Sequence, residues 1–137
     1  MTKTKNAKPA KNGNAMTEAN KKMLFQVRDN NAENQDLLEE LEQRLQDHFS
    51  ELEILSKKRG KKKEADSLWK DAERLEEFLH DEFSRVDNLS TKQEGNVKTK
   101  ELKEMLEESE DVQMAINCIE EDFGTFEEEL EEVQTKK

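Results

Sequence analysis

The sequence has little of what most compact or catalytic folds use. Its 137 residues include no tyrosine, one tryptophan, one cysteine, one proline and four glycines. A single cysteine, Cys118, cannot form an intramolecular disulfide or a zinc site built from cysteine pairs, and it is compatible with a reducing compartment. No apolar run exceeds three residues, so we expect neither a transmembrane helix nor a signal-peptide core.

Apolar side chains are also scarce. They make up 31% of the chain, whereas Asp, Glu, Lys and Arg make up 42%. Ordinary soluble domains are about 45–50% apolar when glycine is included, so this chain cannot fill the interior of a compact α/β domain. It can fill a narrow row between long helices. Low hydropathy with a net charge of −11 is also compatible with intrinsic disorder, and the periodicity of the apolar residues decides between the two.

That periodicity is most regular in the carboxy-terminal part of the chain. Positions spaced alternately three and four residues apart are apolar there, with Ser109 as the exception, and a disordered chain would not keep such a pattern. The spacing predicts a helix over residues 100–134. We expect its apolar row to be a docking strip for a different polypeptide, formed by Leu102, Met105, Val112, Ile116, Ile119, Phe123, Phe126, Leu130 and Val133.

Two earlier segments show the same spacing and predict helices over about residues 19–58 and 62–89. With the third helix they predict an all-α protein, either an elongated helical bundle or coiled coil, or a hairpin from which the third helix protrudes. The two earlier helices should supply the bundle core, formed by Leu38, Leu41, Leu45, His48, Leu52, Leu55, Leu68, Trp69, Leu75, Phe78, Leu79, Phe83 and Val86.

Two asparagines interrupt the first apolar row. Asn31 occupies an inward position at which a buried amide can set the register of a coiled coil. In the alternative interpretation, which we favour, residues 20–35 fray and Asn31 and Asn34 are solvated.

A basic segment separates the first two predicted helices. Gly60 and a one-residue slip of the heptad phase indicate a corner, although a continuous, distorted helix is also compatible with the sequence. The segment could contact an anionic partner through Lys57, Lys58, Arg59, Lys61, Lys62 and Lys63. Residues 1–18, rich in lysine, should form a disordered basic arm, and residues 135–137 a short tail.

The chain offers little catalytic chemistry. Glu77 and His80 have the spacing found in di-iron helical bundles, but the heptad phase points both outward. His48 lies among leucines, which favours a packing role, and the acidic neighbours of Cys118 disfavour a reactive thiolate. We therefore expect no enzyme activity, no cofactor, no bound metal and no small-molecule substrate.

Charge on the third helix indicates the kind of partner. Between Glu101 and Glu132 there are fourteen acidic residues and one lysine, Lys103. A parallel, in-register homodimer of this helix would bring no attractive pairs together across its flanks. A hetero-oligomer with other helical subunits is therefore expected rather than a parallel homodimer.

The segment ADSLWKDAERLEEFL, Ala65–Leu79, resembles a helical segment of the small coiled-coil central-element proteins of the synaptonemal complex. The likeness lies in Leu68, Trp69, Lys70, Ala72, Leu75, Glu76, Phe78 and Leu79. It implies a structural protein of chromosomes.

The expected function is that of a non-enzymatic scaffold or adaptor subunit in a larger cytoplasmic hetero-oligomeric assembly. Vesicle or organelle biogenesis, tethering and cytoskeletal linkage are the types of process that such subunits serve. The alternative is a nuclear, chromosome-associated coiled-coil protein of synaptonemal-complex or kinetochore type, with secondary contacts from the basic segments to nucleic acid.

Overall fold

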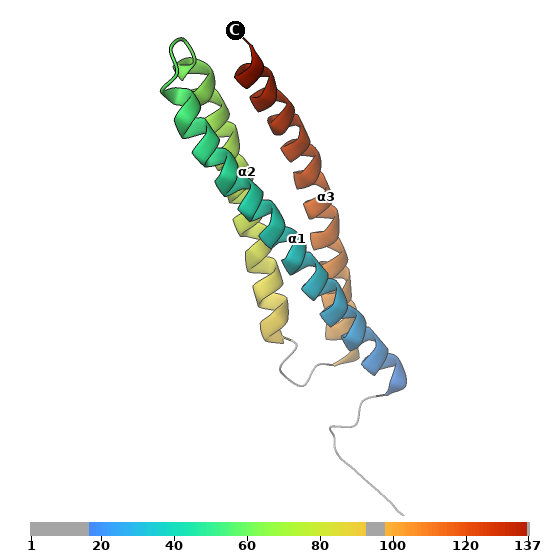
Figure 1. Cartoon of the computed structure of the whole chain (residues 1–137). Coiled ribbons are helices and arrows are strands. Elements are labelled where there is room, and N and C mark those ends of the chain that lie inside the picture. The colour runs from blue at the N-terminus through green and yellow to red at the C-terminus, as the bar shows by residue number, and fades with distance from the viewer. Residues whose placement is uncertain (1–16, 93–97, 137) are drawn as a thin grey trace, which may run out of the picture.

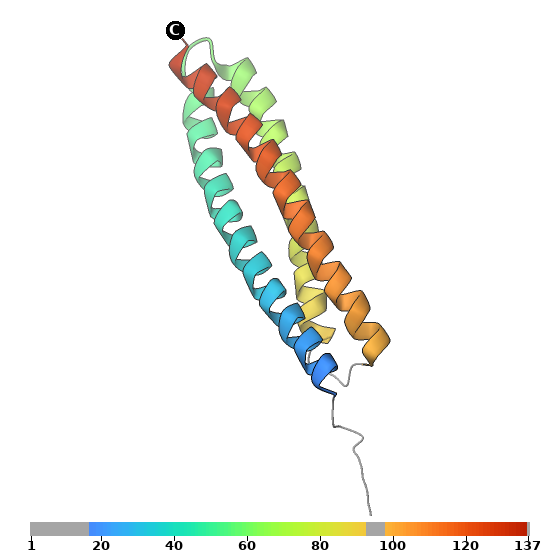
Figure 2. The same ribbon diagram turned by 90° about the vertical axis from the view of Figure 1, so that its right-hand side faces the viewer.

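A computed structural model describes residues 17–92 and 98–136 of the chain. Three helices follow one another, α1 (Glu18–Ser56), α2 (Lys62–Lys92) and α3 (Thr99–Thr135). They lie side by side as a long rod in which α2 runs antiparallel to its two neighbours (Figures 1 and 2). The predicted all-α class is confirmed, and the helix bounds differ from the predicted ones by at most three residues. Most of the predicted basic arm, residues 1–16, lies outside the described residues.

Local chemistry explains where α1 begins and where it ends. The side chain of Thr17 accepts a hydrogen bond from the backbone N–H of Asn20, which caps the helix start. At the other end Gly60 has a φ of 78°, a left-handed conformation that glycine adopts without steric cost. The chain turns there and α2 begins at Lys62, so the corner interpretation is correct and a continuous helix is excluded.

One residue of this corner also closes the end of α3. The ammonium group of Lys61 donates to the carbonyl oxygens of Val133 and Lys136, at 2.7 and 2.6 Å. Because the last carbonyls of a helix lack partners within it and carry partial negative charge, a lysine at this position satisfies both needs. At least one cation of the corner, Lys61, therefore has a role in the fold that does not depend on a partner.

The core lies along the axis of the rod, where each helix packs against the other two. All residues of the predicted docking strip are buried in it except Val133, which is partly buried against it. The prediction that this row binds a different polypeptide is therefore wrong for the folded chain. Helices α1 and α2 cover the row, because two short connections let them pack along the full length of α3 (Figure 2). A protruding third helix is excluded for the same reason.

Most residues of the predicted bundle core are buried, with exceptions at the flanking positions. Trp69 and Phe78 remain 37% and 39% exposed, so the prediction that they belong to the buried core is wrong. The side chains of His48 and Phe83 are partly buried. A three-helix rod closes over a narrow inner row, and large side chains beside that row reach solvent with one edge. Among the described helices, none is apolar enough over a sufficient length to cross a lipid bilayer.

A polar layer divides the core near the amino-terminal end of α1. The amide of Asn31 donates to the carbonyl of Val86 and the hydroxyl of Ser90, and that of Asn34 donates to the carbonyl of Ser109. Both asparagines are helical and at least 96% buried, so the favoured expectation of fraying is wrong. The layer separates the main apolar cluster from a small one formed by Val27, Leu89 and Met105.

Candidate functional site

Among the described residues, three clusters of charged side chains bridge neighbouring helices, one for each pair of helices. We call them the His48 cluster, between α1 and α3, the Arg85 cluster, between α2 and α3, and the Glu42 cluster, between α1 and α2. They are the places where ionisable groups from distant parts of the sequence meet, and so they are the candidates for chemistry or binding.

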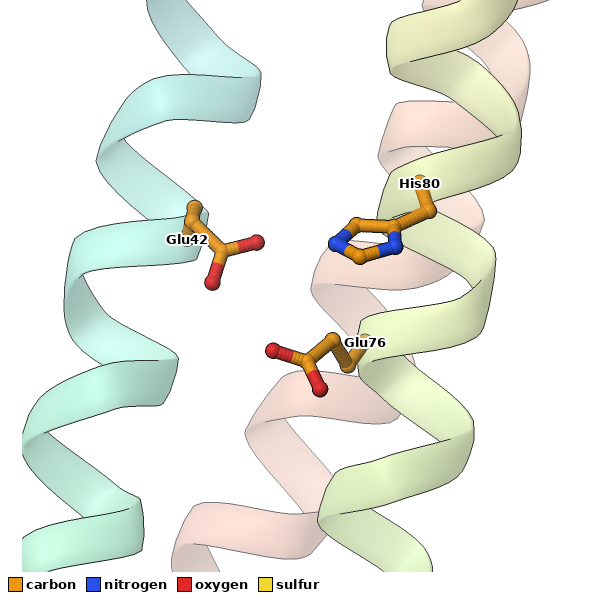
Figure 3. A group of neighbouring side chains, drawn as sticks. All are labelled: Glu42, Glu76 and His80. Carbon is orange, nitrogen blue, oxygen red and sulfur yellow. The ribbon is translucent and has the colours of Figure 1, made fainter.

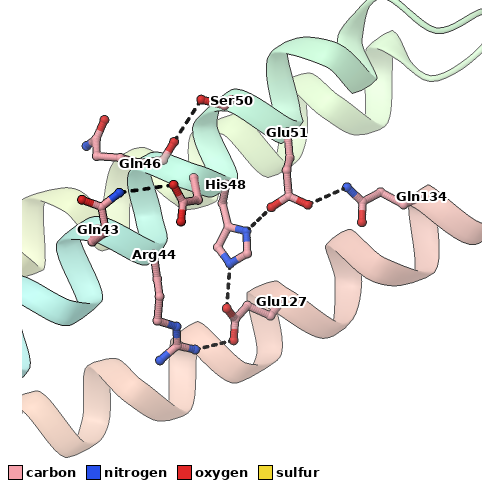
Figure 4. Close-up of polar contacts among 9 residues, drawn as sticks. Gln43, Arg44, Gln46, His48, Ser50, Glu51, Glu127 and Gln134 are labelled. Carbon is pink, nitrogen blue, oxygen red and sulfur yellow. Dashed lines mark hydrogen bonds and ion pairs between the residues drawn. The ribbon is translucent and has the colours of Figure 1, made fainter.

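The His48 cluster holds α1 against α3 (Figure 4). Glu127 of α3 receives Arg44 on one carboxylate oxygen and the Nε2 atom of His48 on the other, both at 2.6 Å. The Nδ1 atom of His48 lies 2.6 Å from Glu51. A carboxylate can only accept, so a doubly protonated imidazole donates to both partners, whereas a neutral one donates to one. The ring also packs against Phe126, with centroids 5.6 Å apart. His48 therefore packs against an aromatic ring, as predicted, and also links the carboxylates of Glu51 and Glu127.

These contacts shift the pKa of Glu127. Burial alone would raise the pKa of this carboxyl, but hydrogen bonds from His48 and Arg44 and their positive charge outweigh it and hold the pKa below its ordinary value. A carboxyl with a lowered pKa stabilises the folded state above its unfolded pKa, and that stabilisation is lost as pH falls through the folded pKa. The His48 cluster should therefore loosen in acid.

We expect Glu127→Gln to lower the melting temperature at pH 7 and to flatten its decline in acid. The difference in melting temperature between wild type and variant should shrink as pH falls below about 4.5, the ordinary pKa of a glutamate, because the wild-type carboxylate becomes protonated only below that value. Thermal unfolding followed by circular dichroism measures this difference. Glu128→Gln, at an exposed neighbouring position, is the control and should show no such convergence. A constant difference for Glu127→Gln would contradict the assignment.

The Arg85 cluster holds α2 against α3. Arg85 lies 2.8 Å from Glu108 of α3 and 3.0 Å from Glu82 on its own helix. Glu82 is 8% exposed and takes a position in the inward row of α2. Burial raises its pKa, and the charge of Arg85 only partly offsets that effect. At neutral pH this carboxylate therefore costs stability, and protonation in acid relieves the cost.

The Glu42 cluster differs because it contains no cationic residue of the Lys or Arg type. Glu42 of α1 and Glu76 and His80 of α2 place one ligand atom each within 4.8 Å of one another (Figure 3). The side-chain amide of Gln46 donates to both carboxylates, at 2.6 Å to Glu42 and 3.1 Å to Glu76. Glu77 and His80 are exposed as predicted, but Glu76 rather than Glu77 accompanies the histidine.

The outer face of α3 is strongly acidic. Of its fourteen acidic residues between Glu101 and Glu132, only Glu108 and Glu127 are partly buried, and both have ion-pair partners on other helices. The other twelve are exposed. Met114, 65% exposed, lies in the same surface region as Glu107 and Asp111. We call the exposed carboxylates of α3 between Glu101 and Glu132, together with Met114, the acidic face.

The basic corner presents most of its charge to solvent at the opposite end of the rod from the start of α1 (Figure 1). Lys61 is partly buried, and its ammonium group is hydrogen-bonded to backbone carbonyls at the end of α3. The other predicted contact residues are exposed, namely Lys57, Lys58, Arg59, Lys62 and Lys63. Cys118 is a free, exposed thiol.

No protein-family model, curated protein or solved structure matches this chain. Its function must therefore be inferred from its own residues. The sequence alone did not predict that Glu42 lies near His80 or that Glu127 contacts His48, because heptad spacing defines the face of one helix and not its axial position against another.

Proposed function

We propose that this chain is a non-enzymatic scaffold or adaptor subunit of a larger, cytoplasmic hetero-oligomeric assembly, and that it recruits a basic partner through the acidic face of α3. The observation that carries the proposal is the exposed charge of that face, twelve carboxylates with Lys103 as the lone basic residue between Glu101 and Glu132. The apolar row, which is buried within the chain, is not required for the contact.

The supporting argument is electrostatic. Like charges along one face repel one another and give the chain no benefit in folding, whereas a basic surface brought against them is attracted and correctly oriented. Met114, exposed in the same region, offers an apolar side chain to such a partner. The rod shape supports a bridging role, because α3, a helix of 37 residues, runs along one side of the molecule.

A charge-neutralised variant tests this proposal. We expect Glu104→Gln, Glu107→Gln, Glu110→Gln and Asp111→Asn together to weaken partner binding about thirtyfold, at roughly 0.5 kcal/mol for each surface charge. Affinity capture from native extract with quantitative mass spectrometry identifies the partner, and binding of that partner to the purified variant gives the ratio.

The control carries the same change in charge on α1, in Asp29→Asn, Glu33→Gln, Asp36→Asn and Glu40→Gln, all at exposed positions. It should bind the partner as the wild type does. Equal loss in both variants would show a response to net charge alone, and no loss in either would overturn the proposal.

A second candidate function rests on the basic corner. Its five exposed cations would attract an anionic partner, and the resemblance of residues 65–79 to synaptonemal-complex central-element proteins supports a chromosomal, nuclear role. Binding to duplex DNA that falls steeply with salt, and disappears when these five residues are neutralised, would favour this candidate over the first.

A further inference from the structure

We infer that the Glu42 cluster is a binding site for a transition-metal dication of the zinc type, which ties α1 to α2. This inference goes beyond the proposed function, since it concerns a different face of the rod and a different ligand. It rests on the placement of three ligand groups from two helices and on the absence, among the described residues, of an ion pair between either carboxylate and a lysine or arginine.

The three side chains converge from two neighbouring helices. Glu76 and His80 are four residues apart on α2, so they share one face of that helix. Glu42 reaches toward them from α1, and all three groups point into the space between the two helices (Figure 3). Helix α3 lies behind this space and contributes no ligand to the cluster.

The distances suit a tetrahedral ion after a small adjustment. Bonds of about 2.0–2.2 Å from zinc to nitrogen and oxygen place two ligands about 3.4 Å apart. The ligand atoms here lie within 4.8 Å of one another, so they need to approach by at most about 1.4 Å. Rotation of these side chains, which are exposed or only partly buried, can supply that movement. Solvent reaches His80, so water can complete the coordination.

Charge is the independent argument. Each of the other two clusters that join helices matches its carboxylates with a guanidinium, Arg44 with Glu127 and Arg85 with Glu108. In the Glu42 cluster two carboxylates from different helices converge on the neutral amide of Gln46, and no described lysine or arginine forms an ion pair with either. A dication supplies the missing positive charge, and the amide of Gln46, hydrogen-bonded to both carboxylates, orients them toward it.

The donor set selects the class of metal. One imidazole nitrogen with two carboxylates suits Zn²⁺, and with it Co²⁺ and Ni²⁺, whereas Mg²⁺ and Ca²⁺ favour sites made of oxygen alone. In the alternative, no metal ion binds and a proton on the imidazole of His80 supplies the positive charge that balances the two carboxylates. Metal titration separates these two cases.

Calorimetric titration of the full chain with zinc chloride tests the site, with cobalt absorption spectra as a second readout of ligand number and geometry. We expect His80→Ala to weaken Zn²⁺ binding by more than about tenfold, and Glu42→Gln with Glu76→Gln to weaken it further, because each change removes a direct ligand. Zn²⁺ should raise the melting temperature of the wild type but not of these variants, and Mg²⁺ should not replace it.

The matched control is Glu39→Gln with Glu77→Gln, which removes the same charge from exposed positions on the same two helices and should leave Zn²⁺ binding unchanged. Three results would overturn the inference. They are no Zn²⁺ binding up to about 1 mM, binding that is indifferent to the loss of His80, and equal weakening in the control. Circular dichroism of each variant confirms that it is folded before titration.

Discussion

Ile116→Asp should unfold the isolated chain. Ile116 is 0% exposed in the main apolar cluster, where all three helices meet. Loss of a buried isoleucine side chain costs about 2–5 kcal/mol, and burial of a carboxylate without a partner adds several more. Domains of this size have a total stability of about 5–15 kcal/mol, so the variant should lose most or all of it. Circular dichroism at 222 nm and thermal unfolding at micromolar concentration measure the loss.

Met114→Asp is the control for this variant. It makes the same exchange of an apolar side chain for a carboxylate two residues away, but at a position that is 65% exposed. We expect it to keep a cooperative transition close to that of the wild type. If Ile116→Asp stayed folded and lost only partner capture, the apolar row would be a docking strip after all, as the sequence alone suggested.

Ile116 also shows how far sequence reasoning reaches. Its spacing from Val112 and Ile119 correctly predicts burial, because a side chain in such a row must be covered. The same spacing carries no information on which helix covers it, since rows on the same chain and on another chain look alike. The lack of attractive pairs in a parallel, in-register homodimer disfavours that dimer, but it does not distinguish a second protein from the other helices of the same chain. Short connections between long helices favour packing of each helix against its neighbours in the same chain, and this sequence has two of them.

Phe78 and His48 illustrate a second limit. Helical spacing places both near the core but cannot say how wide the core is, and in a three-helix rod Phe78 keeps one edge in solvent. His48 meets Glu127, 79 residues later in the chain, because of the axial register between α1 and α3. Register depends on the packing of the whole interface, and pairwise contacts of this kind are therefore seen only in the structure.

Removal of the polar layer formed by Asn31 and Asn34 should increase the stability of the folded chain. The side-chain oxygens of Asn31 and Asn34 are buried and have no hydrogen-bond donor among the described residues. An unsatisfied buried acceptor costs about 1–3 kcal/mol, and an apolar side chain in its place gains about 2 kcal/mol, whereas each lost amide hydrogen bond gives back about 1 kcal/mol. Asn31→Val with Asn34→Leu should therefore raise the free energy of unfolding by a net 2 kcal/mol or so, after allowance for tighter packing.

The same change should weaken structural uniqueness. Asn31 pairs α1 with α2 through Val86 and Ser90, and Asn34 pairs α1 with α3 through Ser109, so together they favour one axial position for all three helices. Two apolar replacements fit several positions equally well, including positions on a second copy of the chain. Light scattering should show dimers or mixed species for the double variant, whereas the wild type should remain uniform.

Asn117→Leu, at an exposed position of α3, controls for the higher helix propensity of leucine and should change stability by about 0.5 kcal/mol or less. Chemical denaturation gives the free energies for all three proteins. A double variant less stable than the wild type would mean that the two orphan oxygens have partners, such as buried water, that balance their burial. A more stable variant that stayed uniform would assign register to the three charged clusters instead. The observed outcome therefore identifies which polar contacts set the axial register of the three helices.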